Sequence, residues 1–251
     1  MKIARFLYQN EPQWGVIDGE DLRSLPGGSF NDPQPGRSVC KQAAAKLLAP
    51  IDPYRNKVPA MAANYGEKAG RDGPGIFMKQ AGTVIGPGDA IVYPRSCTKV
   101  LHEAEVGIVI AKKARHVSVE EALEYVLGYT CVNDVSAAEM KTNDVGRGMS
   151  LRWKHFDTFC PIGPYIVTDM DGDNLGITCR VNGETVLEGS TSDMLWSMAE
   201  VVSWTSEVMT LYPGDIIPSG CPNALPFEIG DIVEIDIEGI GTLSNPVVRD
   251  S

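Results

Sequence analysis

The stretch LHEAEVGIVIA, residues 101–111, combines an apolar run with two carboxylates. Its second half is continuously apolar, which is typical of a β-strand that is buried on both faces. Because alternate side chains of a strand point to the same side, Glu103 and Glu105 share one face. Two neighbouring carboxylates in a buried place repel each other and lose their solvation unless a cation or water relieves them. The stretch therefore predicts a buried strand whose acidic half needs such a partner.

A divalent metal ion is the cation that this pair of glutamates suits. Mg²⁺, Mn²⁺ and Ca²⁺ are hard ions that prefer oxygen ligands. Asp134, in CVNDVS, falls at the end of the next predicted strand, where a second strand can lie beside the first. Three carboxylates would hold the ion and leave positions for water and substrate. A solvated strand face with two acids is the alternative that the spacing alone leaves open.

Composition and charge exclude several classes of protein. The chain has 251 residues, 43% of them hydrophobic, which is enough for a sizeable core. Its net charge of −11 and lack of clustered Lys and Arg argue against binding to nucleic acid. No apolar run is long enough for a signal peptide or a membrane span, so we expect a cytoplasmic protein. Six cysteines without a CxxC pair favour reduced thiols over disulfides or a zinc site.

Strand and turn signals dominate the chain. Two hairpins are predicted, one at Asp18-Gly19 and one at Asn182-Gly183. The breaker-rich segment 26–36 separates the first hairpin from the rest. We therefore expect a mainly β protein with a few packing helices (α+β), divided into a small N-terminal β unit (1–55) and a larger domain (56–251).

Three segments carry helix signals. The first is KQAAAKLLAP, residues 41–50, and the second is SVEEALEYVLG, residues 118–128, which opens with a capping box of Ser118 and Glu121. The third extends from Ser192 or Asp193 to Trp204. The segment 139–152 gives no signal that we can interpret, and we expect a loop there.

The order of several motifs resembles the fumarylacetoacetate hydrolase superfamily, in its acylpyruvase and 2-hydroxyhepta-2,4-diene-1,7-dioate isomerase-like branch. The motifs that carry the resemblance are LHEAEVGIVIA, YTCVNDVSA, WKHFDTFCPIGPYIV, VNGETVLEGSTSDMLWS, LYPGDIIPSGCP and GDIVEIDIEGIGTLSNPV. The resemblance covers about Asn64 to Val248, and the small β unit ahead of it also resembles the family's N-terminal appendage. It implies a mixed β-roll or barrel, a homodimer, a Mg²⁺ or Mn²⁺ cofactor, and a 2-oxo acid or 1,3-dicarbonyl substrate.

The resemblance also implies roles for individual residues. It assigns Glu103, Glu105 and Asp134 to the metal and Lys154 to the cation that orients the substrate. The expected substrate contacts are Asn64 and Tyr65 at the base of a lid loop, and Ser219 and Cys221 in PSGCP. Apart from the resemblance, the segment 139–152 offers Arg147 or Arg152 to hold a second carboxylate.

The chain departs from the family pattern in its lid. Many members carry N-Y-x-x-H-x-x-E, a His-Glu pair that activates water, but this chain reads NYGEKAGR and places Lys68 and Arg71 at those two positions. Glu67 or Lys68 would then carry the proton. In addition, Ala138-Glu139 stands where many members have Arg-Asp, and Cys221 replaces a threonine, so the thiol is a weaker hydrogen-bond donor there.

Three functions remain open from the sequence. The first is an enzyme that works through a metal-stabilised enolate and needs no activated water, namely a tautomerase/isomerase or a decarboxylase. The second is a C–C bond hydrolase of the acylpyruvate or fumarylacetoacetate type, with Glu67 or Glu139 as the base. The third is a metal-binding family member without catalysis.

Overall fold

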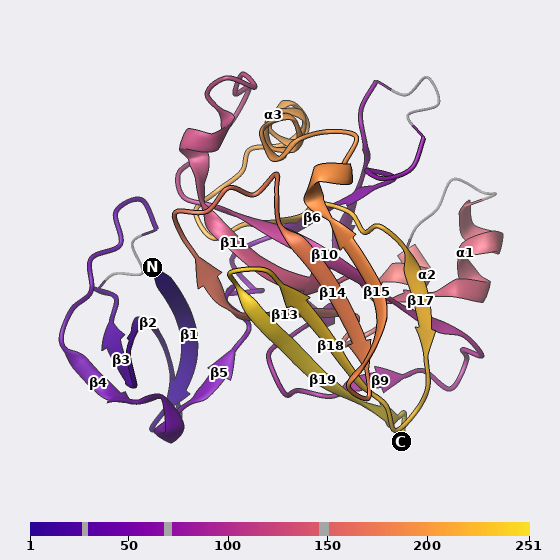
Figure 1. Ribbon diagram of the computed structural model, residues 1–251, viewed down its shortest axis with the longest axis horizontal. Coiled ribbons are helices and arrows are strands. Elements are labelled where there is room, and N and C mark those ends of the chain that lie inside the picture. The colour runs from indigo at the N-terminus through magenta and orange to yellow at the C-terminus, as the bar shows by residue number, and fades with distance from the viewer. Residues whose placement is uncertain (27–29, 68–71, 146–150) are drawn as a thin grey trace.

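The computed structural model describes residues 1–251 except 27–29, 68–71 and 146–150. The fold is mainly β with short helices, as the sequence predicts (Figure 1). In the described residues, the largest sheet has 12 strands, and its main path runs β12-β10-β11-β13-β1-β2-β3-β4. Its strands are β1 (Lys2–Tyr8), β2 (Glu11–Asp18), β3 (Asp21–Ser24), β4 (Ser38–Lys41), β5 (Lys46–Leu48), β8 (Val84–Ile85), β10 (Val100–Ile110), β11 (Val126–Asn133), β12 (Ser136–Ala137), β13 (Cys160–Val167), β16 (Ile216–Pro218) and β17 (Ala224–Phe227).

Two smaller sheets complete the described β-structure. The first has the order β15-β14-β18-β19-β9, and the second is a hairpin of β6 and β7. Their strands are β6 (Val58–Ala62), β7 (Gly75–Lys79), β9 (Ile91–Tyr93), β14 (Gly176–Val181), β15 (Glu184–Ser190), β18 (Ile232–Ile237) and β19 (Gly241–Arg249). The predicted turn at Asn182-Gly183 joins β14 and β15, with φ angles of 53° and 82°. Glycine adopts such angles without strain, and asparagine tolerates them better than most residues do.

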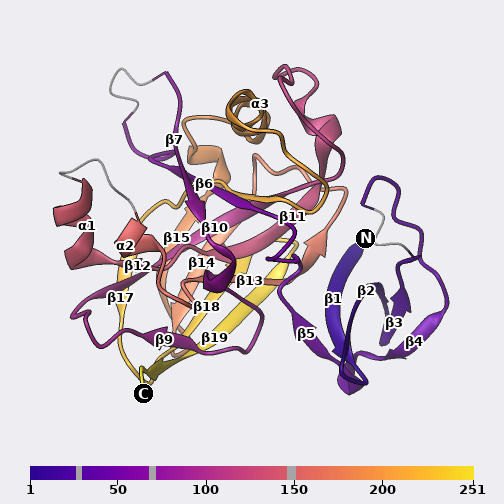
Figure 2. The same ribbon diagram turned by 180° about the vertical axis from the view of Figure 1, so that it is seen from behind.

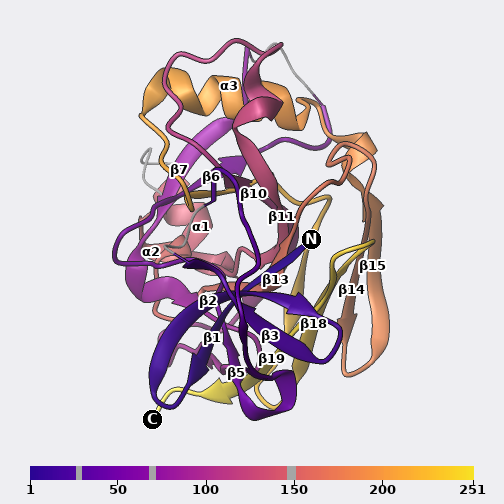
Figure 3. The same cartoon turned by 90° about the vertical axis from the view of Figure 1, so that its left-hand side faces the viewer.

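The small N-terminal unit is connected to the main domain by strand pairing. Its strand β1 pairs with β13, where Lys2 lies opposite Val167 and Ile3 lies opposite Ile166. Figure 1 shows the unit in indigo beside the larger body, and Figure 3 shows it facing the viewer. Ile3 also packs in one buried cluster with Ile162 and Ile166 of the main domain. The unit is thus an extension of the largest sheet and shares part of its core.

Two of the three predicted helices are not formed as predicted. The predicted helix at 41–50 is wrong, since this segment forms β4, a 3₁₀ turn and β5. Strand β5 pairs with β1, and this pairing outweighs the local helix propensity of the alanines. The predicted helix at 118–128 is reduced to a 3₁₀ turn over Ala122–Tyr125, because the chain enters β11 at Val126.

Three α-helices lie in the described part of the chain. They are α1 (Ala138–Val145), α2 (Leu151–Lys154) and α3 (Met198–Val208). Helix α3 starts later than the predicted residue 192, with a capping box formed by Ser197 and Glu200. Helices α1 and α2 occupy much of the segment that we expected to be a loop. None of these helices is long and apolar enough to cross a membrane.

Candidate active site

Strand β10 carries both glutamates, and the strands on its two edges are interrupted beside them. On one edge, β11 pairs with β10 and β12 resumes the pairing after a gap. On the other edge, β16 and β17 leave a similar gap. Asp134 lies in the first gap, and Gly220 and Cys221 lie in the second. Figure 1 labels β10, β11 and β17, and Figure 2 also labels β12. The two gaps bring polar groups to the acidic part of a strand that is otherwise fully paired.

The three predicted acidic residues line one cavity of about 250 Å³. Glu105 and Asp134 are each 1% exposed, and Glu103 is 8% exposed. Both backbone groups of Glu103 form hydrogen bonds: its N–H donates to Asn133 Oδ1 and its carbonyl accepts from Asp134 N. The chain that follows β11 thus places Asp134 beside Glu103.

Lys154 is a buried cation that joins two of the acids. Its Nζ donates to Glu103 Oε2 at 2.9 Å and also forms an ion pair with Asp134 Oδ2. Ser136 Oγ donates to the other oxygen of Glu103 at 2.5 Å. The Lys154 side chain therefore lies inside the cavity wall, next to any ligand that enters.

Lys79 is a second buried lysine, and the sequence analysis did not identify it. Its Nζ lies 2.8 Å from Asp134 Oδ1 and donates to the Lys154 carbonyl at 2.6 Å. It comes from β7, in the apolar stretch IFMK, where a lysine at the end of a strand gives no distinct signal. Both oxygens of Asp134 thus face a lysine ammonium.

The charges shift the pKa values of these groups in opposite directions. Burial alone would raise the pKa of Asp134, but Lys154 and Lys79 outweigh it and hold that pKa below its usual value. Burial alone would lower the pKa of Lys154, but Asp134, Glu103 and Glu105 raise it. Burial and then the charges of Asp134 and Glu103 raise the pKa of Glu105 well above its usual value. Lys154 is therefore protonated and partly offsets the shift of Glu105, which forms no ion pair with a described residue.

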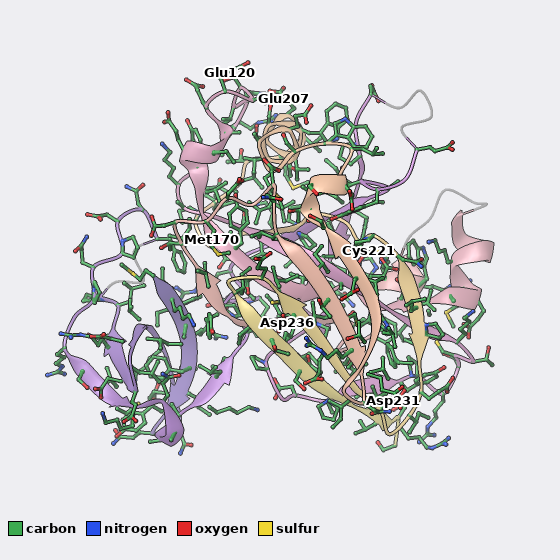
Figure 4. The ribbon with its side chains drawn as sticks, in the orientation of Figure 1. Glu120, Met170, Glu207, Cys221, Asp231 and Asp236 are labelled. Atoms are coloured by element: carbon green, nitrogen blue, oxygen red, sulfur yellow. The ribbon has the colours of Figure 1, made fainter. Side chains whose placement is uncertain are left out.

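The second gap supplies a backbone donor and a thiol. Gly220 N donates to Glu105 Oε2 at 2.9 Å, and Cys221 Sγ lies 3.6 Å from Glu103 Oε2. The ligand atoms of Glu103, Glu105 and Cys221 all lie within 4.8 Å of one another. Figure 4 labels Cys221 on the segment that connects β16 and β17. Burial and then Glu103 raise the pKa of the thiol well above its usual value.

This donor set fits a divalent ion. Buried carboxylates that face a cavity, where Glu105 forms no ion pair with a described residue, are surroundings in which a hard ion binds. Glu103 and Glu105 offer oxygen atoms directly, and Cys221 adds a sulfur beside them. Asp134 borders the same cavity, but its oxygens are engaged by the two lysines.

Of the two predicted residues at the lid base, Asn64 is buried and Tyr65 is partly buried. The Asn64 side chain donates to the carbonyls of Trp196 and Ser219 and accepts from Trp196 N at 2.9 Å. The hydroxyls of Tyr65 and Ser219 are buried and have no hydrogen-bond partner within the described structure. Burial and then Glu105 and Cys221 raise the pKa of Tyr65, so its phenol is protonated beside the acids.

The remaining predicted residues lie further out. Glu67 is exposed on the segment after β6, and Lys68 and Arg147 lie outside the described residues. Arg152 lines a different hollow, of about 510 Å³, together with Gln80 and His155. The structure does not bring Arg152 to the wall of the smaller cavity. Lys141, which the sequence analysis did not single out, lines that wall instead.

Together the β-roll fold and the acidic site with its buried lysine define an enzyme of the fumarylacetoacetate hydrolase type. Residues 53–248 match the family described as fumarylacetoacetate (FAA) hydrolase C-terminal, and residues 1–50 match the family described as Rv2993c-like, N-terminal. The chain belongs to the fumarylacetoacetate hydrolase superfamily.

Similar proteins of known structure or assigned name support this membership. A structure of 5-carboxymethyl-2-hydroxymuconate delta-isomerase from Mycobacterium smegmatis is 40% identical, with a TM-score of 0.92 and full coverage of both chains. The human mitochondrial protein named oxaloacetate tautomerase FAHD2A is 35% identical over 98% of this chain and 79% of its own length. A maleylpyruvate hydrolase from Sphingobium sp. SYK-6, solved with manganese(II) and pyruvate, is 28% identical, with a TM-score of 0.82 and full coverage of both chains.

Proposed function

We propose that the protein is a divalent-metal-dependent enzyme that tautomerises or isomerises a 2-oxo acid through an enolate. The observation that carries the proposal is the buried Lys154 ammonium beside Glu103 and Asp134, on the wall of the cavity that Glu105 also lines. A fixed cation in this place stabilises negative charge that develops on a substrate oxygen. The names of the similar tautomerase and isomerase support the same class of reaction.

The proposal includes Mg²⁺ or Mn²⁺ as cofactor. Glu103 and Glu105 would hold the ion, Asp134 would complete the set of carboxylates, and Cys221 would lie beside them. When bound, such an ion supplies Lewis-acid stabilisation to the carboxylate and keto oxygens of a 2-oxo acid. The manganese(II) and pyruvate in the similar hydrolase structure support this choice of cofactor and substrate class.

The chain's own residues would orient the substrate and move the proton. Lys154 stays protonated, so it donates a charge-assisted hydrogen bond to the substrate carboxylate or keto oxygen. The protonated phenol of Tyr65 is a further donor, at the lid base with Asn64. Glu67 or Lys68 would transfer the proton between carbon and oxygen. Ser219 would contribute a hydroxyl near the same end of the site.

Tautomerisation fits the altered lid better than hydrolysis does. It moves a proton within the substrate and consumes no water, so the His-Glu pair that Lys68 and Arg71 replace is not required. C–C hydrolysis is the second candidate, and the similar maleylpyruvate hydrolase favours it. A homodimer and a cytoplasmic location belong to the same proposal.

Absorbance of the oxaloacetate enol, followed with Mg²⁺ or Mn²⁺ present, tests the proposal. We expect the protein to accelerate enol–keto interconversion by about 100-fold or more over buffer, and a chelator to abolish the effect. Lys154→Met should remove most of the acceleration, because it deletes the charge at similar volume. Lys154→Arg keeps the charge, and circular dichroism of both variants shows whether they fold.

Other outcomes would assign a different function. Release of CO₂ or of cleavage products faster than enol conversion would identify a decarboxylase or a hydrolase. If neither oxaloacetate nor a conjugated hydroxydienoate reacts while calorimetry still shows binding of the ion, the protein is a metal-binding family member without this catalysis.

A further inference from the structure

Lys141 is a cation at the cavity that the proposed chemistry leaves without a role. It lies on α1 and lines the cavity together with Glu103, Lys154 and Asn223. Its side chain is exposed, and its ammonium lies 5.1 Å from the centre of the Trp153 ring. No carboxylate of the described residues forms an ion pair with it. Lys141 therefore presents a positive charge at the cavity that a ligand can neutralise.

The other lysines of the site are not available in this way. Lys154 forms ion pairs with Glu103 and Asp134, and Lys79 forms an ion pair with Asp134. Both are buried, whereas Lys141 is in contact with solvent at the edge of the same cavity. A second anionic group of a bound substrate would thus meet Lys141 before it meets any other unneutralised lysine of the cavity wall.

The start of α1 is hydrogen-bonded to Thr98 and Lys99, directly ahead of the strand β10 that carries the two glutamates. The Glu139 carboxylate accepts from Thr98 N at 2.5 Å and from Lys99 N at 3.3 Å, and Ala138 N donates to the Lys99 carbonyl at 2.9 Å. Burial alone would raise the pKa of Glu139, but these backbone donors lower it. Glu139 is therefore an ionised anchor that is engaged away from Lys141, which follows within one helical turn.

The distances limit how far Lys141 lies from the proposed reaction centre. The ammonium of Lys154 lies 4.8 Å from the centre of the Trp153 ring, and that of Lys141 lies 5.1 Å from the same point. Their separation is at most the sum of these two distances. Because each ammonium–carboxylate hydrogen bond itself spans about 2.8 Å, a short-chain diacid can contact both lysines.

We propose that Lys141 binds the second carboxylate of the substrate and selects dicarboxylic 2-oxo acids over monocarboxylic ones. The inference rests on the proposed function, because it takes the 2-oxo carboxylate end of the substrate to lie beside Lys154. Lys141 then acts on specificity, since it contacts the second carboxylate and not the carbon and oxygen atoms that exchange the proton. Its loss should change KM for diacids and leave kcat nearly unchanged.

A pair of substrates that differ only in the second charge tests this role. Tautomerisation of oxaloacetate is compared with that of its 4-methyl ester, in the wild type and in Lys141→Gln, Lys141→Arg and Lys113→Gln. We expect Lys141→Gln to raise KM for oxaloacetate about tenfold, with KM for the ester and both kcat values within about twofold. Lys141→Arg should keep the preference, and Lys113→Gln, at an exposed lysine outside the cavity lining, should behave as the wild type.

The result that overturns the inference is distinct from failure of the proposed function. If Lys141→Gln changes both substrates equally or neither, Lys141 does not select diacids, although turnover still supports a tautomerase. If the wild type converts neither substrate, tryptophan fluorescence with malate and lactate, two unreactive 2-hydroxy acids, still decides the inference. Malate should bind about tenfold more tightly than lactate to the wild type and equally to Lys141→Gln. An unchanged preference in the variant would refute the role of Lys141.

Discussion

Lys79 and Lys154 place two ammonium groups on one buried carboxylate, that of Asp134. Ion pairs of this kind are sensitive to the loss of one partner, because the remaining charge stays in a place that water reaches poorly. Lys79 is not part of the cavity lining, yet it also donates to the carbonyl of Lys154. We therefore regard Lys79 as a positioning residue that fixes Asp134 and the end of α2.

Replacement of Lys79 should lower stability much more than replacement of a surface lysine. We expect Lys79→Met to reduce the free energy of unfolding by about 3 kcal/mol at pH 7. Lys41→Met removes an exposed ion pair with Asp21, and it should cost less than about 1 kcal/mol. Urea unfolding with a chelator present measures both.

The pH dependence gives this prediction a sign. The pKa of Asp134 is lowered in the folded protein, so its ion pairs contribute fully above the usual aspartate pKa of about 4. As the pH falls through the lowered value, Asp134 becomes protonated and the contribution is lost. The difference in the free energy of unfolding between the wild type and Lys79→Met should become smaller only in this acidic range. If Lys79→Met loses no more free energy of unfolding at pH 7 than Lys41→Met does, Lys79 has no positioning role.

Strand β10 has no room for extra atoms at its centre. A Cβ added at Gly107 would lie 2.7 Å from Val132 Cγ2 and 3.0 Å from Ile216 Cγ2, on the two neighbouring strands. Gly107→Ala should therefore destabilise the fold by about 1–3 kcal/mol. Gly75→Ala is the matched control, since its Cβ meets Ala62 at an ordinary 3.4 Å.

The control should change stability in the opposite direction. Alanine restricts the unfolded chain more than glycine does, so Gly75→Ala should stabilise the protein by about 0.5 kcal/mol. Thermal unfolding of both variants by circular dichroism compares them. Equal effects of the two substitutions would show that β10 and its neighbouring strands separate easily at Gly107, contrary to the packing described.

The strands were predictable from sequence to a greater extent than the helices. A continuous apolar run identified β10, which is buried on both faces, and alternation identified β18, which is buried on one face. The segment 41–50 has good helix propensity, but β5 pairs with β1, which is far away in the chain. Helix α1 is polar and short, so it carries no periodic signal. Pairing between distant segments therefore decided the elements that were predicted wrongly.

In the site too, local patterns were predictable and contacts between distant segments were not. The shared face of Glu103 and Glu105 follows from the period of a strand, and Asp134 follows from the adjacent strand. The role of Lys154 came from the family resemblance, since a lysine after a loop gives no signal by itself. Lys79 reaches the site only because β7 and the chain after β11 meet in space, and no spacing in the sequence records that contact.

At the scale of the molecule, the N-terminal unit and the main domain share hydrophobic core. Ile3 is fully buried in a cluster that includes Ile162, Ile166 and Ile216 of the main domain. Trp14 of the unit packs edge-on against Phe30 at 4.8 Å. Because core and strand pairing both cross the boundary, we expect the two parts to unfold together.

Ile3→Ala tests this cooperativity. It should lower the free energy of unfolding by about 2–4 kcal/mol, because it leaves a cavity between the two parts. The variant Trp14→Phe, compared with the wild type, isolates the fluorescence change of the N-terminal unit. In urea, that change should coincide with the loss of far-ultraviolet circular dichroism in a single transition, with and without Ile3→Ala. Two separate transitions would show that the unit folds independently.

The paired interruptions on either side of β10 have a consequence for how the site can evolve. One residue inserted ahead of Glu103 would turn both glutamates to the opposite face and move them out of line with Asp134 and Cys221 at once. A change of length outside this strand, such as in the turn between β18 and β19, leaves the alternation of the two glutamates as it is. We therefore expect the length of β10 to vary less among related proteins than the lengths of such turns.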